Sequence, residues 1–162
     1  MMGKIHFGCP GANNRLTPQK IDQARQALEE AALLILQYEI PAETIRYVLD
    51  LAAEIQVSVL WNFAPARSFD LSYLQKVRYL VANEVEAEFL SGQKIHSAED
   101  ARQAAQIIQS RGANVVVVTL GEKGSFHLSP NEAFHTPAFQ VQAVDTTGAG
   151  DVFCGALATA LV

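Results

Sequence analysis

Basic residues and long apolar runs are both scarce in this sequence of 162 residues. The 12 Lys and Arg stand against 17 Asp and Glu, which gives a net charge of −5. Without a positive field to hold a phosphate backbone, we expect no nucleic-acid partner. The longest strongly apolar stretches, 31–36 and 115–118, fall far short of the roughly 18 residues that a membrane-spanning helix needs. We therefore expect no membrane association.

Cysteine is rare as well, and several common site motifs are missing. Cys9 and Cys154 form no CxxC pair, so we expect two buried apolar thiols in a reducing compartment. The N-terminus has no apolar signal segment, and the cytoplasm is the expected location. No GxxxxGK[ST] motif is present, which excludes a Walker-type NTPase. No metal-ligand spacing such as HExxH occurs among the histidines, which are His6, His96, His127 and His135.

Helical and strand patterns alternate over the first three quarters of the chain. Helix-type periodicity or capping signals mark segments 16–31, 42–55, 84–90 and 97–112, with Thr17 as the predicted N-cap of the first. Short buried strands are predicted at 33–37, 57–63, 79–83 and 114–121. Segment 122–143 instead predicts antiparallel strands joined by a turn at 129–131.

This alternation predicts an α/β fold, with a largely parallel sheet flanked by helices and antiparallel strands near 122–143. No linker divides the chain, so we expect one domain over 1–162. The last predicted helix ends on the apolar residues Ala160, Leu161 and Val162 without a polar cap. We therefore expect the domain to be truncated, with more chain needed to cover this helix.

The strongest chemical signal is the segment 144–156, VDTTGAGDVFCGA, in which a strand pattern closing at Val144 leads into a turn and a helix. The glycines at 148 and 150 let the backbone approach a ligand closely, and the amides of a helix start attract an anion such as phosphate. Asp151, in the first turn, is placed to accept a proton from a nearby hydroxyl. A tight turn in which Asp151 only complements the helix dipole is the alternative interpretation. Phe153 replaces the third glycine of a dinucleotide fingerprint, which disfavours an oxidoreductase.

Other polar residues follow the predicted strands, where open α/β sheets bind ligands. Glu39 follows the first strand, Asn83 and Glu86 follow the third, and Thr119 and Gly121 end the fourth. The N-x-x-E spacing places Asn83 and Glu86 on one face of a helix start. Taken singly, Asn83 can be an N-cap and Glu86 a partner of the helix dipole.

Six segments in order resemble the ribokinase-like PfkB family of carbohydrate kinases. The most specific is VDTTGAGDVFCGALA at 144–158; the others are PGANNRLT at 10–17, LILQYEIP at 34–41, NFAPAR at 62–67, NEVEAEFLSG at 83–92 and VVTLGEKGS at 117–125. The resemblance covers essentially the whole chain. It implies a ribokinase-like fold and transfer of the γ-phosphoryl group of ATP to the primary hydroxyl of a sugar, with ribose as the expected substrate and another pentose as an open alternative.

The resemblance also assigns roles to residues of the glycine turn and the strand ends. Asp151 matches the family's base, and Gly148, Ala149 and Gly150 match the anion hole for the transferring group. Glu39 matches a carboxylate that accepts a sugar hydroxyl.

The remaining matched positions concern nucleotide and cations. Asn83 and Glu86 match a motif that places phosphate and Mg²⁺, largely through water. Thr119 and Gly121 match nucleotide contacts. Asp145 and Thr147 match part of a monovalent-cation site, expected to take K⁺.

Complete members of the family are longer at both ends. The sequence lacks the family's N-terminal sugar-binding segment and β-strand lid, together with the end that completes the adenine pocket. We therefore expect an unpaired sheet edge and little or no sugar phosphorylation by this chain alone. The alternative is an inactive remnant that binds nucleotide or associates with another chain. A homo-oligomer stays open, because the family's dimer forms through the missing lid.

Overall fold

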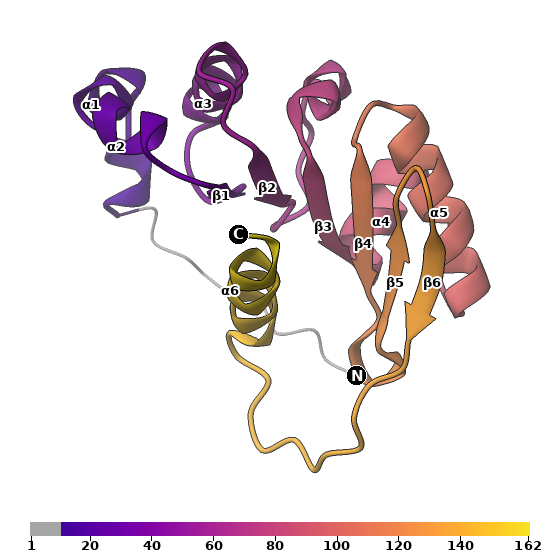
Figure 1. Cartoon of the computed structure of the whole chain (residues 1–162). Coiled ribbons are helices and arrows are strands. Elements are labelled where there is room, and N and C mark those ends of the chain that lie inside the picture. Colours follow the sequence, from indigo (N-terminus) through magenta and orange to yellow (C-terminus); the bar gives the residue numbers. More distant parts are fainter. Residues whose placement is uncertain (1–10) are drawn as a thin grey trace.

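In the computed structural model, which describes residues 11–162, six strands form one sheet (Figure 1). Cys9 and His6 lie outside the described residues. The strands are β1 (Leu34–Gln37), β2 (Val59–Asn62), β3 (Tyr79–Asn83), β4 (Val115–Thr119), β5 (Ser125–Leu128) and β6 (Ala133–Thr136). They lie in the sheet in chain order. The first four are parallel, and β5 and β6 are antiparallel, which confirms the predicted mixed sheet.

Helices cover the two faces of the sheet unequally. The helices are α1 (Pro18–Gln23), α2 (Arg25–Glu29), α3 (Ala42–Glu54), α4 (Glu84–Ser91), α5 (Ala98–Ser110) and α6 (Ala149–Leu161). Because side chains alternate across a strand, β2 sends Trp61 into the large core with α3, α4 and α5, and Leu60 into a smaller cluster with α6. Helix α6 therefore packs on the other face of the sheet from α3, α4 and α5 (Figure 1).

Aromatic residues fill the large core beneath the end of β2. Tyr38, Trp61 and Phe63 are all buried, and their rings meet at centroid distances between 5.0 and 6.1 Å. The hydroxyl of Tyr38 donates a hydrogen bond to the carbonyl of Ser68 at 2.8 Å. The prediction that Cys154 is buried is also confirmed. Burial raises the pKa of the Cys154 thiol to about 11, so this thiol is protonated near neutral pH.

The predicted first helix, 16–31, is divided into α1 and α2. Ala24 lies between them with φ −99° and ψ 6°, and its N–H donates to the carbonyl of Ile21 at 2.9 Å. This three-residue bond tightens the chain and interrupts the α-helical ladder. Thr17 precedes α1, but its side chain makes no capping hydrogen bond, while Pro18 occupies the first turn.

Two strand predictions were wrong at their margins. The antiparallel region ends at Thr136 and does not reach 143, and Val144 is 98% exposed outside any strand. A segment with an apolar strand pattern joins a sheet only where a neighbouring strand is available to pair with it. In the described sheet no strand lies beyond β6, so the segment that ends at Val144 has no such partner there. The strand at 33–37 is not buried on both faces, because Ile35 lies on edge strand β1 and is 47% exposed.

Candidate functional site

All four parallel strands end in a polar residue at the same edge of the sheet. The last residues of β1 to β4 are Gln37, Asn62, Asn83 and Thr119. Parallel pairing brings Gln37 opposite Asn62 and Asn83 opposite Thr119. Open parallel sheets bind ligands outside these carboxyl ends, so this edge is the natural place for a polar site.

The glycine turn completes the site from the last helix. Gly148 caps α6 with φ 76°, a left-handed conformation that favours glycine. Val152 donates the first helical hydrogen bond, to the Gly148 carbonyl at 3.0 Å. The amides of Gly150 and Asp151 precede that bond and therefore have no intrahelical acceptor. Nothing lies within 4 Å of a Cβ built on Gly148 or Gly150, so the turn is open to a ligand.

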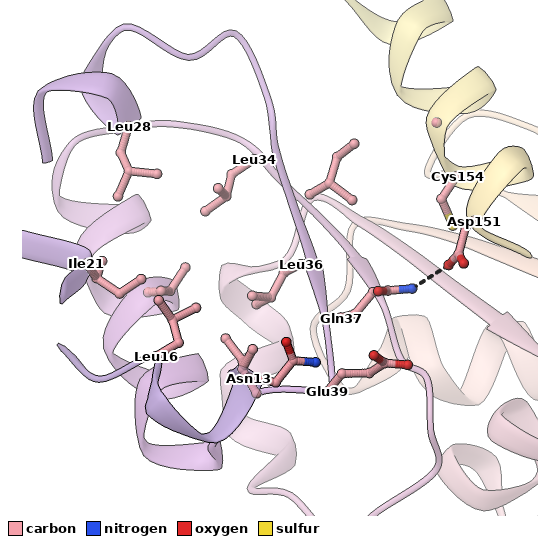
Figure 2. Close-up of a pocket in the computed structure, with 14 residues that line it drawn as sticks. Asn13, Leu16, Ile21, Leu28, Leu34, Leu36, Gln37, Glu39, Asp151 and Cys154 are labelled. Atoms are coloured by element: carbon pink, nitrogen blue, oxygen red, sulfur yellow. Dashed lines mark hydrogen bonds between the residues drawn. The ribbon is translucent and has the colours of Figure 1, made fainter. Parts of the chain in front are cut away.

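Asp151 is joined to the edge strand by a hydrogen bond. The side-chain amide of Gln37, in β1, donates from Nε2 to Oδ1 of Asp151 at 2.7 Å (Figure 2). The bond spans 114 positions of sequence and orients the carboxylate across the sheet edge. Asp151 is exposed, so its second oxygen, Oδ2, can receive a hydrogen bond or a proton from a ligand.

Asn83 and Glu86 form a capping box at the start of α4. The Asn83 side chain accepts the Glu86 N–H at 3.0 Å, and Glu86 Oε2 accepts the Asn83 N–H at 2.9 Å. Glu86 is only 6% exposed, and its burial raises the pKa of its carboxyl, although the hydrogen bonds from Asn83 partly oppose this. The structure therefore confirms that Asn83 is an N-cap, while the role of Asn83 and Glu86 toward phosphate and Mg²⁺ stays a prediction.

One cavity of about 200 Å³ brings most of the predicted residues together. Those that line it are Glu39, Asn83, Glu86, Thr119, Gly148, Ala149, Gly150 and Asp151. Three predicted residues, Gly121, Asp145 and Thr147, are not among its lining residues. Thr147 instead donates its N–H to Oδ1 of Asp145 at 2.9 Å, which lowers the pKa of that carboxyl, while Thr146 between them reaches the cavity.

Besides Thr146, sequence reasoning missed three polar residues of this region. Gln37 and Asn62 line the same cavity, and Asn13 lines a neighbouring one. The rule that selected Glu39 and Asn83, polarity at a strand end, also applies to Gln37 and Asn62. Asn13 precedes the first helix, and no strand or helix pattern distinguishes it.

The neighbouring cavity is larger, about 470 Å³, and lies on the α1 side of β1. Gln37, Glu39 and Asp151 line both cavities, so these three residues separate them. Figure 2 shows their polar side chains at one side and leucine and isoleucine side chains at the other. A ligand on either side of Asp151 therefore meets the same carboxylate.

The donor set around Glu86 suits a hydrated cation. Within residues 11–162 no three acidic, histidine or cysteine side chains gather to hold a metal ion. Mg²⁺ keeps several waters and is bound through one or two carboxylates together with substrate phosphates, so Glu86 next to the glycine turn fits it. Asp145 and Thr147 supply a single anionic donor, which by itself does not make a site for K⁺.

No helix in the part of the chain described here combines the length and apolarity that crossing a bilayer would require.

Comparison with known proteins matches this sequence to one family. The family model for pfkB family carbohydrate kinases matches residues 7–162. A deoxyribokinase of Salmonella typhimurium is 40% identical over 149 residues, covering 91% of this chain and 49% of the relative. A ribokinase of Staphylococcus aureus is 34% identical over 151 residues, covering 93% and 50%. The chain thus spans about half the length of the curated relatives it matches.

Solved structures agree with the sequence relatives. The ribokinase of Thermotoga maritima superposes with a TM-score of 0.81 at 40% identity, covering 94% of this chain and 50% of that one. The Arabidopsis thaliana ribokinase, complexed with ribose and ATP, superposes with a TM-score of 0.80 at 29% identity, covering 86% and 46%. The ribokinase-like fold expected from the sequence is confirmed, and the chain belongs to the PfkB family of carbohydrate kinases.

Proposed function

We propose that this chain carries the phosphoryl-transfer part of a pentose kinase that uses ATP. The observation that supports this most directly is the position of Asp151, a carboxylate in the first turn of α6 beside the open amides of the glycine turn. Phosphoryl transfer needs a group that receives the acceptor proton and donors that stabilise charge on the transferring group. Asp151 and segment 148–151 supply these two parts within one helical turn.

The proposed reaction begins with the primary hydroxyl of the pentose next to Asp151. Oδ2 of Asp151 accepts the hydroxyl proton as the oxygen attacks the γ-phosphorus of ATP, and the bond to the β,γ-bridging oxygen breaks to release ADP. The amides of Gly150 and Asp151 stabilise the negative charge on the transferring oxygens. Gln37 holds Oδ1, which keeps Oδ2 directed toward the acceptor.

The two cavities divide the substrates in this proposal. The phosphates of ATP occupy the smaller cavity, beside Asn83, Glu86 and Thr119, and the sugar approaches Asp151 from the larger one, near Glu39. Mg²⁺, when bound, neutralises phosphate charge there, with Glu86 acting through water. Gly121 follows β4 and is proposed to contact the nucleotide beyond the phosphates.

Ribose and 2-deoxyribose are both candidate acceptors, because the relatives include ribokinases and a deoxyribokinase. The test is ADP release from MgATP in KCl buffer with D-ribose, with 2-deoxy-D-ribose, and without sugar. Because the chain spans about half of its relatives, we expect the sugar-dependent release to be slow, and Asp151→Asn should abolish it. Gln93→Leu, a change outside both cavities, is the matched control. Repeating the assay in NaCl tests the expected K⁺ activation.

A second candidate function, nucleotide binding without turnover, is favoured by the coverage of only about half of each relative. Titration of the chain with MgADP separates the two. Binding without sugar-dependent ADP release supports the second function, and release that survives Asp151→Asn contradicts the first.

A further inference from the structure

A tight turn follows β4 next to the smaller cavity. Thr119, the last residue of β4, lines that cavity, and the turn over residues 121–124 comes directly after it. Leu120 donates its N–H to the Gly124 carbonyl at 2.8 Å, and Gly124 donates its own to the Gly121 carbonyl at 3.1 Å. In the proposed function this is the turn whose Gly121 contacts the nucleotide, so whatever fixes its conformation bears on nucleotide binding.

His135 holds the turn from β6. Its Nε2 lies 2.7 Å from the carbonyl oxygen of Lys123. Because a carbonyl oxygen only accepts, Nε2 carries a proton and donates this hydrogen bond. Strand pairing places His135 opposite Phe126, whose side chain is buried in the large core with α5. Residues directly opposite each other lie on the same face of a sheet, so His135 reaches the turn across the face that α5 covers.

The backbone of β6 also approaches the turn closely. A Cβ built on Gly124 would lie 1.9 Å from the carbonyl oxygen of Thr136, the residue after His135. Gly124 has φ 95°, a conformation that favours glycine. The turn and β6 therefore meet backbone against backbone, and His135 adds a side-chain bond across this contact.

A different bond holds the turn on the α5 side. The ammonium group of Lys123 donates to the carbonyl of His96 at 2.9 Å. His96 directly precedes Ser97, the N-cap of α5. Lys123 is thus tied to α5 by its side chain and to β6 by its carbonyl. Neither α5 nor β6 contributes a residue to the lining of the two cavities described above, so both act on the turn from outside them.

We propose that His135 is a positioning residue for the nucleotide and acts by holding the 121–124 turn in its binding conformation. The inference rests on the proposed function, in which Gly121 contacts the nucleotide beyond its phosphates. A turn that is already ordered loses less conformational entropy when a ligand binds, so this preorganisation raises affinity. The turn lies away from the reacting atoms and contacts the nucleotide before and during phosphoryl transfer alike. His135 therefore influences the KM for MgATP and the Kd for MgADP, and leaves kcat nearly unchanged.

The experiment measures the Kd for MgADP by isothermal titration calorimetry on the whole chain and on variants of His135. His135→Leu removes the donor and should weaken binding about 2- to 12-fold, the effect of one hydrogen bond. Glutamine places an amide nitrogen close to the position of Nε2, so His135→Gln should restore the affinity. The shorter side chain of His135→Asn does not reach the Lys123 carbonyl, and this variant should bind as weakly as His135→Leu.

His127→Leu is the matched control. His127 lies on the opposite face of β5, where its ring stacks on Phe134 at a centroid distance of 4.7 Å. We expect its Kd for MgADP to equal that of the unchanged chain. Hydrogen exchange of the Lys123 and Gly124 amides reports the order of the turn directly. Exchange of these amides should be faster in His135→Leu and unchanged in His127→Leu.

Three results would overturn the inference: equal Kd values for His135→Leu and the unchanged chain, equal weakening by His127→Leu, or no recovery in His135→Gln. Absence of MgADP binding by the unchanged chain overturns it together with the nucleotide part of the proposed function. Weaker binding by His135→Leu in a chain without sugar-dependent ADP release supports the inference and contradicts turnover, so the two can fail separately. If circular dichroism shows that His135→Leu is unfolded, His135→Asn, which keeps a polar side chain, takes its place.

Discussion

The side-chain amide of Gln37 donates to the carboxylate of Asp151 at 2.7 Å and joins the edge strand β1 to the first turn of α6. The two residues come from opposite ends of the described chain. The bond occupies Oδ1 of Asp151 and leaves Oδ2 free for a substrate. The orientation of the proposed base therefore depends on Gln37, which lies outside the glycine turn.

Gln37→Met should therefore reduce turnover while leaving nucleotide affinity nearly unchanged. Methionine keeps the length of the side chain but cannot donate a hydrogen bond. A hydrogen bond to a charged group contributes about 1.5–3 kcal/mol, which corresponds to roughly a 10- to 150-fold loss of kcat if the whole effect falls on the orientation of Asp151. The assay is sugar-dependent ADP release from MgATP, with the Kd for MgADP measured alongside. Equal turnover of Gln37→Met and the unchanged chain would contradict the proposal.

Asn83→Ala should lower both stability and nucleotide affinity, whereas Ser97→Ala should lower stability alone. Each residue forms a capping box, at the start of α4 and α5 respectively. Loss of an N-cap side chain costs about 0.5–2 kcal/mol. Only Asn83 lines the smaller cavity. Urea unfolding measures the first effect and MgADP titration the second, and a matching loss of affinity in Ser97→Ala would show that the effect is only structural.

Glu86 should make the chain less stable as the pH rises above its ordinary pKa of 4.5. Burial raises its pKa above the ordinary value of 4.5, so the folded state holds this proton in a range where the unfolded state has released it. The free energy of unfolding contributed by Glu86 is therefore greatest below the unfolded pKa and decreases as the pH passes through the folded pKa. Glu86→Gln removes this dependence, so its stability relative to the unchanged chain should increase with pH in urea titrations.

Glu88 provides the control for that experiment, since its pKa is shifted in the opposite direction. Hydrogen bonds from Lys94 and Ile95 lower the pKa of the Glu88 carboxyl. Any loss of stability in Glu88→Gln should thus be smallest at low pH, where both forms are uncharged, and grow above the unfolded pKa. A Glu86→Gln variant whose stability relative to the unchanged chain stays constant over this range would contradict the assigned burial effect.

Gly148→Ala should destabilise the fold, while Gly155→Ala should not. Gly148 has φ 76°, where an L-residue costs about 1–2 kcal/mol, although no atom obstructs the added Cβ. Gly155 lies inside α6 without positive φ and with open space around it, so alanine there should add up to about 1 kcal/mol of helix stability. Thermal and urea unfolding measure the change in stability of each variant. The free energy of unfolding should decrease in Gly148→Ala and increase in Gly155→Ala.

Much of the fold was predictable because the strands β2, β3 and β4 carry continuous apolar runs and the helices α4 and α5 carry clear caps. Ser97 and Asn83 were identifiable in the sequence, since a capping box depends on residues three positions apart. Val144 and Ile35 were misjudged because the burial of an apolar side chain depends on a neighbouring element. The local pattern of a strand contains no information about whether that neighbour is present.

The candidate site was predictable where its residues are close in sequence and less so where they are not. The glycine turn and the Asn83–Glu86 pair are local motifs, and the cavity brings them together. The contact between Gln37 and Asp151 depends on how α6 crosses the sheet, which no local pattern specifies. Gly121, Asp145 and Thr147 have places in the described structure, but their roles toward nucleotide and K⁺ stay predictions.

Helix α6 follows all six strands in the sequence, yet it packs on β2, β3 and β4 in the middle of the sheet. On the ribosome, where folding starts from the N-terminal side, the sheet and the helices on its other face can therefore assemble before the glycine turn has emerged. The smaller apolar cluster, around Leu60, Val81 and Val117, stays uncovered during that interval. Nascent chains of this protein should accordingly be most open to chaperone binding just before α6 is released.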